Sequence, residues 1–496
     1  MERARIPLLI LLAAFLVLQA GFSLQWPIAH DEAPLFYEAY LMHVEDRLPY
    51  KDLYDFQMPG SFAAYYLLGA LARFDPFRIR LLDLMLLSAL LVMTYRIMRP
   101  AGIPAALAGG ILFGLHYLQG GASMALQREY LLLLFLAAGL WIGTRGSLSP
   151  ARRFALGFFF GLAGTIKPHA VIGLTPFLFL DVREISRTPG VSFLRALAVS
   201  IPFLLIGAAL PLTAVLLWLG AMDALGSFLD IARNYWPLYA QIDGLLEVRD
   251  RAGRTGFILD QIWRLGGNGY WLIPAAIGVW LAPQDFKRPA GLIAGLAVCY
   301  ALYPALTGQF FPYHFLPFVY FILLLSSLCL SRISSQWRPA AALVLFLAIL
   351  LNVRPSAAFL QQIEGKPVVT STDRAGEIRR FLEANLEAGE TVQPLDWTGG
   401  TLLAMLQARA PLATRYVFDF YFYHHVSEPY IHSLRADFVC QLQEARPRFI
   451  IEVTAMDKPW VNGEDTSREF PQLRALLNRD YFIRLRRDDY QVHERK

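Results

Sequence analysis

Long apolar segments recur through residues 1–353, and they constrain this chain more than any other feature of its sequence. Of its 496 residues, 56% are hydrophobic and only 17% are charged, whereas soluble domains carry about 25% charged residues. A run of about 20 apolar residues crosses the hydrocarbon core of a bilayer as a helix. We therefore predict a polytopic α-helical membrane protein with about eleven spans. The expected spans are Ile6–Leu24, Ile79–Met98, Ile103–Leu118, Tyr130–Thr144, Phe154–Thr165, Ala170–Leu180, Phe193–Leu219, Tyr270–Leu281, Ala290–Leu306, Phe315–Leu330 and Ala340–Leu351.

Charge and cysteine content exclude some classes of protein. A net charge of +5 is small for this length and does not indicate a nucleic-acid partner. The cations gather in short connections such as "TRGSLSPARR" and "DVREISR", which the positive-inside rule places in the cytoplasm. With an odd number of spans, the C-terminal tail is expected outside. The three cysteines, Cys299, Cys329 and Cys440, have no spacing typical of a metal site or a disulfide framework.

The composition predicts two domains. Residues 1–353 form the membrane domain, with two long external loops at residues 25–78 and 220–268. From residue 354 to residue 496 the chain becomes polar, with a short strand pattern in "RFIIEV" and a helical pattern in "DRAGEIRRFLEANLEAG". We expect this part to be a small soluble α/β domain on the extracytoplasmic side.

The first long loop carries an unusual number of carboxylates and tyrosines. Asp31 and Glu32 lie a few residues after the first apolar run and before another apolar stretch. Partial desolvation raises the pKa of a carboxylate, which suits a general base. Asp31 is therefore a candidate catalytic residue. For Glu45, Asp46 and Asp52 a solvated loop is the better interpretation, because charged side chains are usually at the surface.

The segment "HDEAPLFYEAYLMHVEDRLPYKDLYDFQMPG" resembles the first external loop of the bacterial protein mannosyltransferase-like family, which uses dolichyl-phosphate-mannose or related donors. The lipid A aminoarabinose transferase-like proteins are similar, and all belong to the GT-C superfamily of glycosyltransferases. The matching residues are Asp31-Glu32, Pro49-Tyr50-Lys51-Asp52 and Asp55; Met58 replaces a usual proline. Further similarity lies in "LQREYLLLLFLAAGL", "GLAGTIKPHAVIGLTPFL", "FFPYHFLPFVYFILLL" and "ARAPLATRYVFDF".

The resemblance implies an inverting glycosyltransferase of the cell envelope, located in the bacterial inner membrane. It would move a hexose or pentose from a polyprenyl-phosphate donor to a hydroxyl of a glycan, lipid or protein acceptor. Asp31 would be the general base, with Glu32 beside it. Arg128 and Lys167, two cations at predicted external helix ends, would stabilise the phosphate leaving group. The alternatives are snorkelling of Lys167 to the headgroups and a local pair between Arg128 and Glu129.

Four more residues are candidate substrate contacts. Tyr313 and His314 lie at another predicted external helix end, where they could bind phosphate or sugar. Tyr54 and Asp55 lie in the resembling loop, and a tyrosine ring can stack on a sugar or a lipid. Aromatic anchors at the membrane interface would explain the three aromatic residues equally well.

Metal dependence is left open by the sequence. Asp31, Glu32 and Asp55 could hold a divalent cation, since carboxylates favour hard cations. A second possible metal site consists of His424, His425, Glu428 and His432, for which a surface or core location is the better interpretation. No other cofactor is expected.

Two other functional classes compete with the enzyme. A transporter or flippase of lipid-linked envelope precursors would place ionisable groups near the bilayer midplane and often carries inverted repeats. Here the notable charges gather at one predicted membrane face, which favours the enzyme. A scaffold protein of envelope assembly would not need Asp31.

Overall fold

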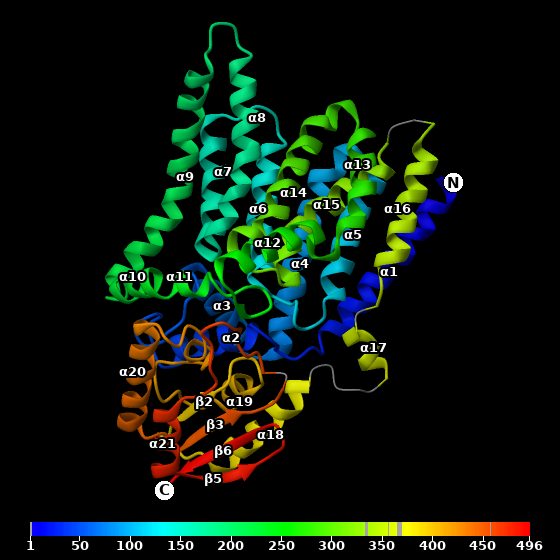
Figure 1. The fold of residues 1–496 in the computed structure, drawn as a ribbon. Coiled ribbons are helices and arrows are strands. Elements are labelled where there is room, and N and C mark those ends of the chain that lie inside the picture. Colours follow the sequence, from blue (N-terminus) through cyan, green and yellow to red (C-terminus); the bar gives the residue numbers. More distant parts are fainter. Residues whose placement is uncertain (1, 333–335, 356, 365–369, 457) are drawn as a thin grey trace. The chain divides into compact units, whose positions relative to one another are not determined.

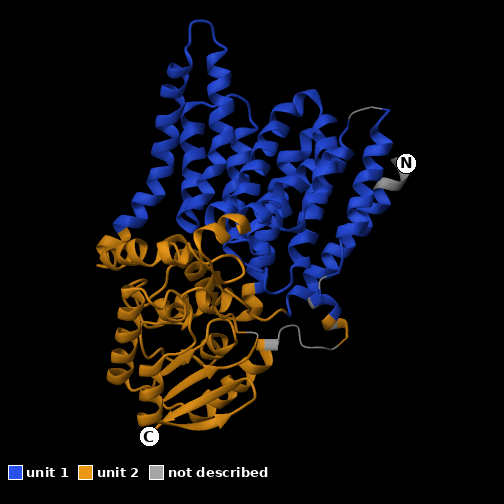
Figure 2. Ribbon diagram, viewed as in Figure 1, with its two compact units in different colours: residues 1–25, 80–217, 258–360 blue, residues 26–79, 218–257, 361–496 orange. Residues whose placement is uncertain are grey.

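The computed structural model describes residues 2–332, 336–355, 357–364, 370–456 and 458–496. The chain forms two compact units, coloured separately in Figure 2. Unit 1 comprises residues 1–25, 80–217 and 258–360, and unit 2 comprises residues 26–79, 218–257 and 361–496. Each unit therefore combines segments that are far apart in the sequence.

Unit 1 is a helical bundle (Figure 1). Its helices follow the apolar runs of the sequence, because a helix that is hydrophobic on all sides must be buried in protein or lipid. They are α1 (Glu2–Ser23), α4 (Pro76–Met98), α5 (Ile103–Gln119), α6 (Arg128–Gly143), α7 (Pro150–Ile166), α8 (Thr175–Ser186), α9 (Phe193–Ala221), α13 (Leu272–Trp280), α14 (Lys287–Thr307), α15 (Leu316–Ser327) and α16 (Arg338–Asn352). Helices α4 and α9 each extend into unit 2 at one end, and two further helices, α12 (Arg251–Arg264) and α17 (Ala357–Ile363), also contain residues of both units.

Helix α15 forms the centre of this bundle. Every one of its residues is buried, and it packs against α5, α6, α13 and α14. Helices α1 and α9 are similarly apolar, but only 17% and 28% of the residues in their most apolar stretches are buried. Exposed apolar side chains are stable in hydrocarbon and unfavourable in water, so α1 and α9 fit the lipid-facing side of a membrane protein.

Five helical segments of the described chain are long and apolar enough to cross a membrane. They are Ile6–Ser23, Pro76–Ala101, Phe193–Ala221, Gln284–Thr307 and Pro312–Leu330. Three shorter apolar helices, Ile103–Gln119, Gly269–Trp280 and Arg338–Asn352, also coincide with predicted spans. The polytopic helical fold class is confirmed by these elements, whereas the number of about eleven spans stays a prediction.

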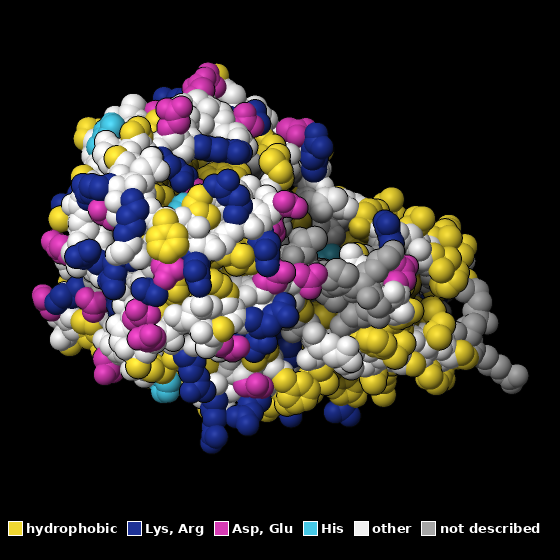
Figure 3. All heavy atoms as spheres, turned by 90° about the horizontal axis from the view of Figure 1, so that it is seen from below, with side chains coloured by type: hydrophobic (Ala, Val, Ile, Leu, Met, Phe, Trp, Pro, Cys, Tyr) yellow, Lys and Arg dark blue, Asp and Glu magenta, His cyan; other side chains and the backbone are white. Residues whose placement is uncertain are grey.

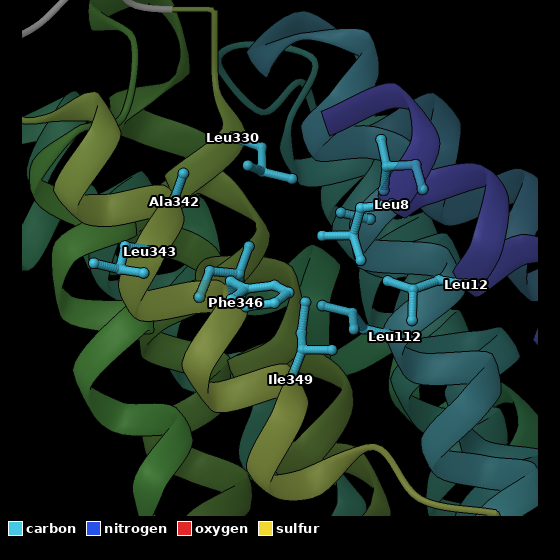
Figure 4. A pocket seen from close by; sticks show the side chains of 11 residues that line it. Leu8, Leu12, Leu112, Leu330, Ala342, Leu343, Phe346 and Ile349 are labelled. Atoms are coloured by element: carbon cyan, nitrogen blue, oxygen red, sulfur yellow. The ribbon is translucent and has the colours of Figure 1, made fainter. Parts of the chain in front are cut away.

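A cavity of about 270 Å³ lies between α1, α5 and α16 within unit 1. Leu8, Leu12, Leu112, Phe346 and Ile349 are among its lining residues, and their side chains point toward one another in Figure 4. All the lining side chains are apolar. Water needs polar partners to occupy a cavity, so this space suits hydrocarbon.

A buried ion pair ties α7, α8 and α9 together. Arg153 of α7 donates two hydrogen bonds to Asp181 of α8, at 2.7 and 3.0 Å. Ser200 of α9 donates to the same carboxylate at 2.5 Å. The sequence predicts Arg153 and Asp181 in basic cytoplasmic connections. In the structure both residues belong to helices and are buried. Burial of the two charges is possible because each satisfies the other.

Unit 2 assembles both long loops with the C-terminal segment. The first loop contributes helices α2 (Glu32–Val44) and α3 (Pro59–Ala72), and the second contributes α10 (Leu225–Asn234), α11 (Trp236–Tyr239) and strand β1 (Glu247–Val248). The C-terminal helices are α18 (Thr370–Asn385), α19 (Thr401–Ala408), α20 (Pro429–Ala445) and α21 (Pro471–Asp480).

A four-stranded mixed sheet forms the C-terminal part of unit 2. Its order is β2 (Val392–Leu395), β3 (Phe449–Val453), β6 (Tyr490–Arg495) and β5 (Tyr481–Arg486). β2 and β3 are parallel, and the other pairings are antiparallel, with Val392 opposite Phe449 and Ile451 opposite Val492. β2 and β3 are completely buried, as expected for apolar strands covered on both faces. A second, two-stranded sheet pairs β1 with β4 (Asn462–Gly463).

An aromatic core joins the three segments of unit 2. The ring of Tyr54, from the first loop, packs against Tyr235 of the second loop and Tyr421 of the C-terminal segment, with centroids 6.1 and 4.8 Å away. The Tyr421 hydroxyl donates to the Tyr54 carbonyl at 2.7 Å, and Trp236 donates to the Phe56 carbonyl at 2.9 Å. Aromatic pairs of this kind add stability beyond the area they bury, so the loops are integral parts of this unit.

Candidate functional site

The start of α6 in unit 1 holds a buried acidic residue surrounded by polar groups. The side chain of Glu129 is completely buried. Its Oε1 lies 3.4 Å from Lys167 Nζ and 3.4 Å from His314 Nε2, and the hydroxyl of Tyr303 donates to it at 3.2 Å. A buried carboxylate is costly without partners, and the Lys167 ammonium and the Tyr303 hydroxyl provide a cation and a donor for the charge of Glu129.

Local sequence explains how these groups reach one point. Lys167 follows α7 in an extended conformation, because the residue before a proline is disfavoured in the helical region, and Pro168 begins the short helix η2 (Pro168–Leu174). His314 lies in η6 (Pro312–Phe315) just before the central helix α15. Each side chain therefore projects from a helix end into the bundle.

The tautomer of His314 follows from its hydrogen bond. Its Nδ1 lies 2.7 Å from the carbonyl oxygen of Gln309. A carbonyl oxygen can only accept, so Nδ1 carries the proton. Nε2, which faces Glu129, then carries a lone pair in the neutral ring and a proton only in the charged ring. A neutral His314 is thus able to accept a proton or a hydrogen bond at Nε2.

The structure groups several of the predicted residues in unit 1. Lys167 and His314 meet at Glu129, and Arg128 is buried beside Glu129 in the chain. The ring of Tyr313 packs edge-on against His314, with centroids 4.6 Å apart. The sequence indicates Glu129 only as a local partner of Arg128, and no pattern in it points to Tyr303 of α14. The consecutive charges of "REY" were the only signal for Glu129.

Asp31 and Glu32 begin helix α2 in unit 2. Asp31 occupies the N-cap position, and its Oδ1 lies 3.1 Å from His30 Nδ1. Glu32 accepts a hydrogen bond from the backbone nitrogen of Ala29 at 3.2 Å. His30 has a φ of 52°, a left-handed conformation that is rare outside glycine and costs energy. Both carboxylates are buried, and the turn at residues 29–32 fixes their backbone.

Asp55 and Tyr54 have structural contacts that the sequence did not predict. Asp55 Oδ1 accepts hydrogen bonds from the backbone nitrogens of Phe56 and Gln57, at 2.5 and 3.3 Å, the pattern of an Asx turn. Tyr54 is buried in the aromatic core, and this burial raises its pKa well above the usual range. Their assignment as substrate contacts stays a prediction.

Within the described residues, no group of three or more histidine, cysteine or acidic side chains is arranged to hold a metal ion. His424 Nε2 lies 3.0 Å from the Tyr235 hydroxyl, and His424 Nδ1 lies 3.1 Å from the Phe420 carbonyl. Burial lowers the pKa of His424 to about 3. His425 Nε2 lies 2.9 Å from the Leu238 carbonyl. These two histidines are core residues of unit 2, which fits the core interpretation given for them above.

Comparison with known proteins identifies the fold of the chain. No protein-family model matches the chain, and no curated protein matches it by sequence. Among solved structures it is similar to ArnT from Cupriavidus metallidurans bound to undecaprenyl phosphate, with a TM-score of 0.60, 13% identity, and coverage of 98% of this chain and 97% of that one. The apo state of the same protein gives a TM-score of 0.58 and 14% identity, covering 99% and 98% of the two chains. The chain therefore has the fold of ArnT over nearly its whole length.

Proposed function

We propose that this protein is a membrane glycosyltransferase that takes a sugar from a polyprenyl-phosphate donor. The observation that carries the proposal is the convergence of Lys167, His314 and Tyr303 on buried Glu129, beside Arg128. It occurs in a chain with the fold of a protein that was crystallised with undecaprenyl phosphate. A phosphate entering this cluster would meet two cations in a region of low dielectric.

In the proposed reaction a hydroxyl of the acceptor attacks the anomeric carbon of the donor sugar. The new bond to the hydroxyl oxygen forms as the bond from carbon to the phosphate oxygen breaks, with inversion at carbon. Negative charge develops on the departing polyprenyl phosphate. Arg128 and Lys167 stabilise that charge, and fixed charges act more strongly where water is scarce. Glu129 holds the Lys167 ammonium in place before the phosphate arrives.

The proton of the attacking hydroxyl passes to a carboxylate, and we assign this role to Asp31. Asp31 is anchored at the start of α2 by its backbone, with His30 beside its carboxylate. Glu32, bound to the backbone of Ala29, positions the same turn. The site would face the extracytoplasmic side of the bacterial inner membrane, with a glycan, lipid or protein as acceptor and a hexose or pentose as the transferred sugar.

The assignment of Asp31 is tested by turnover of a polyprenyl-phosphate sugar by the full chain in detergent. Asp31→Asn removes the proton acceptor but keeps the size of the side chain, and we expect turnover to fall by 10²–10⁴-fold, the usual contribution of a general base. Asp46→Asn is the matched control, since Asp46 is exposed in the same loop. Equal losses in both variants, or in neither, would refute the role of Asp31. Turnover after chelation decides whether a divalent cation takes part.

One observation favours a transporter of lipid-linked precursors as the second candidate. Asp83 of α4 is buried in unit 1 and accepts a hydrogen bond from Tyr117 at 2.7 Å, and Arg80 is buried one turn earlier. Buried ionisable groups in membrane helices often mark transport pathways. Movement of an unmodified carrier lipid across vesicles, without release of sugar, would favour this candidate over the enzyme.

A further inference from the structure

A polar cleft of about 770 Å³ lies within unit 2, between α10 of the second long loop and α20 of the C-terminal segment. Six of its lining residues carry the chemistry: Asp230, Arg233, Arg415, Glu428, Tyr430 and Asp437. The site described above uses none of them. The volume of the cleft is in the range of pockets that hold small ligands.

The groups of the cleft are held in place by contacts around it. The Arg415 guanidinium lies over the rings of Tyr54 and Tyr416, 5.4 and 5.2 Å from their centroids, and pairs with Asp437 at 3.2 Å. The hydroxyl of Tyr430 donates to Asp230 at 2.8 Å and so joins the walls of the cleft. An arginine stacked in this way presents a rigid fork of donors. The cleft is therefore organised before any ligand arrives.

Both donors and acceptors line this cleft. Carboxylates can each accept about four hydrogen bonds, and guanidinium groups only donate. Within the described residues, Arg415 Nε is buried and makes no hydrogen bond to the protein. Arg233 and Glu428 are both exposed on the lining. A ligand that fits must therefore both donate and accept at neighbouring atoms.

The charge balance narrows the ligand class further. Three carboxylates face two guanidinium groups in the lining, so an isolated phosphate or sulfate would meet net repulsion. Basic and acidic side chains are also interspersed over the face of unit 2 drawn in Figure 3, without concentration of one sign. Neighbouring hydroxyl groups on a ring satisfy both requirements, because each donates to a carboxylate and accepts from a guanidinium.

We propose that this cleft binds a saccharide with adjacent hydroxyl groups, neutral or carrying an amino group. Leu238, Pro237 and Leu434 give the cleft apolar surface, which suits the C–H faces of a pyranose ring. The identification of this saccharide as part of the acceptor rests on the proposed function. Binding of a saccharide in the cleft does not depend on the proposed function, since it requires only the geometry of unit 2.

The experiment measures saturation transfer by NMR from the full chain in detergent to the methyl glycosides of glucose, mannose and glucosamine. We expect at least one of them to bind, and Glu428→Gln and Arg415→Gln to weaken that binding about tenfold or more, as the loss of a charged hydrogen bond does. Arg379→Gln is the control, because Arg379 lies exposed on α18, paired with Glu383. Glu428 is exposed, so its variant tests the cleft even if Arg415→Gln fails to fold.

Absence of signal for all three glycosides would overturn the proposal, as would unchanged binding in Glu428→Gln. Displacement of the bound glycoside by inorganic phosphate would overturn it as well, because the cleft would then be an anion site. Turnover of a polyprenyl-phosphate sugar without glycoside binding would refute the cleft but leave the enzyme. Glycoside binding without such turnover would support the saccharide cleft and count against the proposed enzyme.

Discussion

Lys167 illustrates how neighbouring residues set the environment of one side chain. Its position after α7 is set by Pro168, whereas its environment is set by Glu129 on another helix. A lysine at a helix end can reach the headgroups or turn inward. Here the 3.4 Å approach to a buried carboxylate keeps the side chain inward and only partly exposed to solvent.

This placement predicts a loss of carrier binding in Lys167→Gln. A charged hydrogen bond contributes about 1.5–3 kcal/mol, so we expect the Kd for radiolabelled polyprenyl phosphate to rise about tenfold or more. Lys167→Arg, which keeps the charge, should retain most of the binding. Lys287→Gln serves as control, since Lys287 is exposed at the start of α14. An unchanged Kd in Lys167→Gln would remove Lys167 from the phosphate site.

Glu452 of β3 offers a pH-dependent test in unit 2. Burial alone would raise its pKa, but hydrogen bonds and charge from Arg474 and His493 lower it from 4.5 to about 2. The folded chain thus binds this proton less readily than the unfolded chain. Its stabilisation, at most about 3 kcal/mol, is complete above pH 4.5 and is lost as the pH falls toward 2.

We therefore expect Glu452→Gln to lower the thermal midpoint at pH 7 and to differ little from wild type near pH 2. Tryptophan fluorescence of the purified chain measures this midpoint across the pH range. Glu464→Gln, at an exposed position, should match wild type throughout. A constant difference between Glu452→Gln and wild type from pH 2 to 7 would contradict the ionic origin.

At the scale of elements, the packing of α7 against α9 depends on glycines. A Cβ atom at Gly157 would clash with the Leu204 carbonyl, and one at Gly207 would clash with the Phe154 carbonyl. The backbones of α7 and α9 therefore approach more closely than side chains would allow. Small residues are common where membrane helices meet, and "GFFFG" in α7 has the four-residue spacing of such a contact.

Substitution of Gly157 by alanine should separate these two helices. We expect a loss of about 1–3 kcal/mol, the usual cost of overpacking, seen as a lower thermal midpoint in detergent. Gly291→Ala in α14 is the matched control, because a Cβ there meets open space. Alanine has the higher helix propensity, so that control should be neutral or stabilising. An unchanged thermal midpoint in Gly157→Ala would show that the close approach of α7 and α9 is not required for stability.

At the scale of the whole molecule, the proposed chemistry requires unit 2 to be extracytoplasmic. Cys440 is an exposed native thiol on α20 and reports on this directly. In intact cells we expect a membrane-impermeant maleimide to label the wild type and to miss Cys440→Ser. Ser147→Cys in that background should react only after permeabilisation, since Ser147 is exposed in a predicted cytoplasmic connection. The reverse pattern would place the carboxylates of unit 2 inside the cell.

The sequence alone determined that this is a polytopic helical membrane protein and gave approximate bounds for most helices of unit 1. The prediction Ile103–Leu118 corresponds to α5 and Phe193–Leu219 to α9, each within two residues at both ends. Apolar runs predict such helices well, because burying the backbone in hydrocarbon leaves few structures other than helices. The resemblance of the first loop likewise implied a fold, and ArnT has the same fold as this chain.

Only the tertiary structure decided which polar residues meet. Glu129, Lys167, Tyr303 and His314 come from four separate segments of the chain, and apolar patterns do not specify which polar helix ends face one another. The same holds for unit 2, where Tyr54, Tyr235 and Tyr421 join three distant segments into one core. The hydrophobic effect buries apolar runs without selecting particular neighbours. Buried charges and hydroxyls, in contrast, need particular partners at short range, and those partners are brought together only in the folded chain.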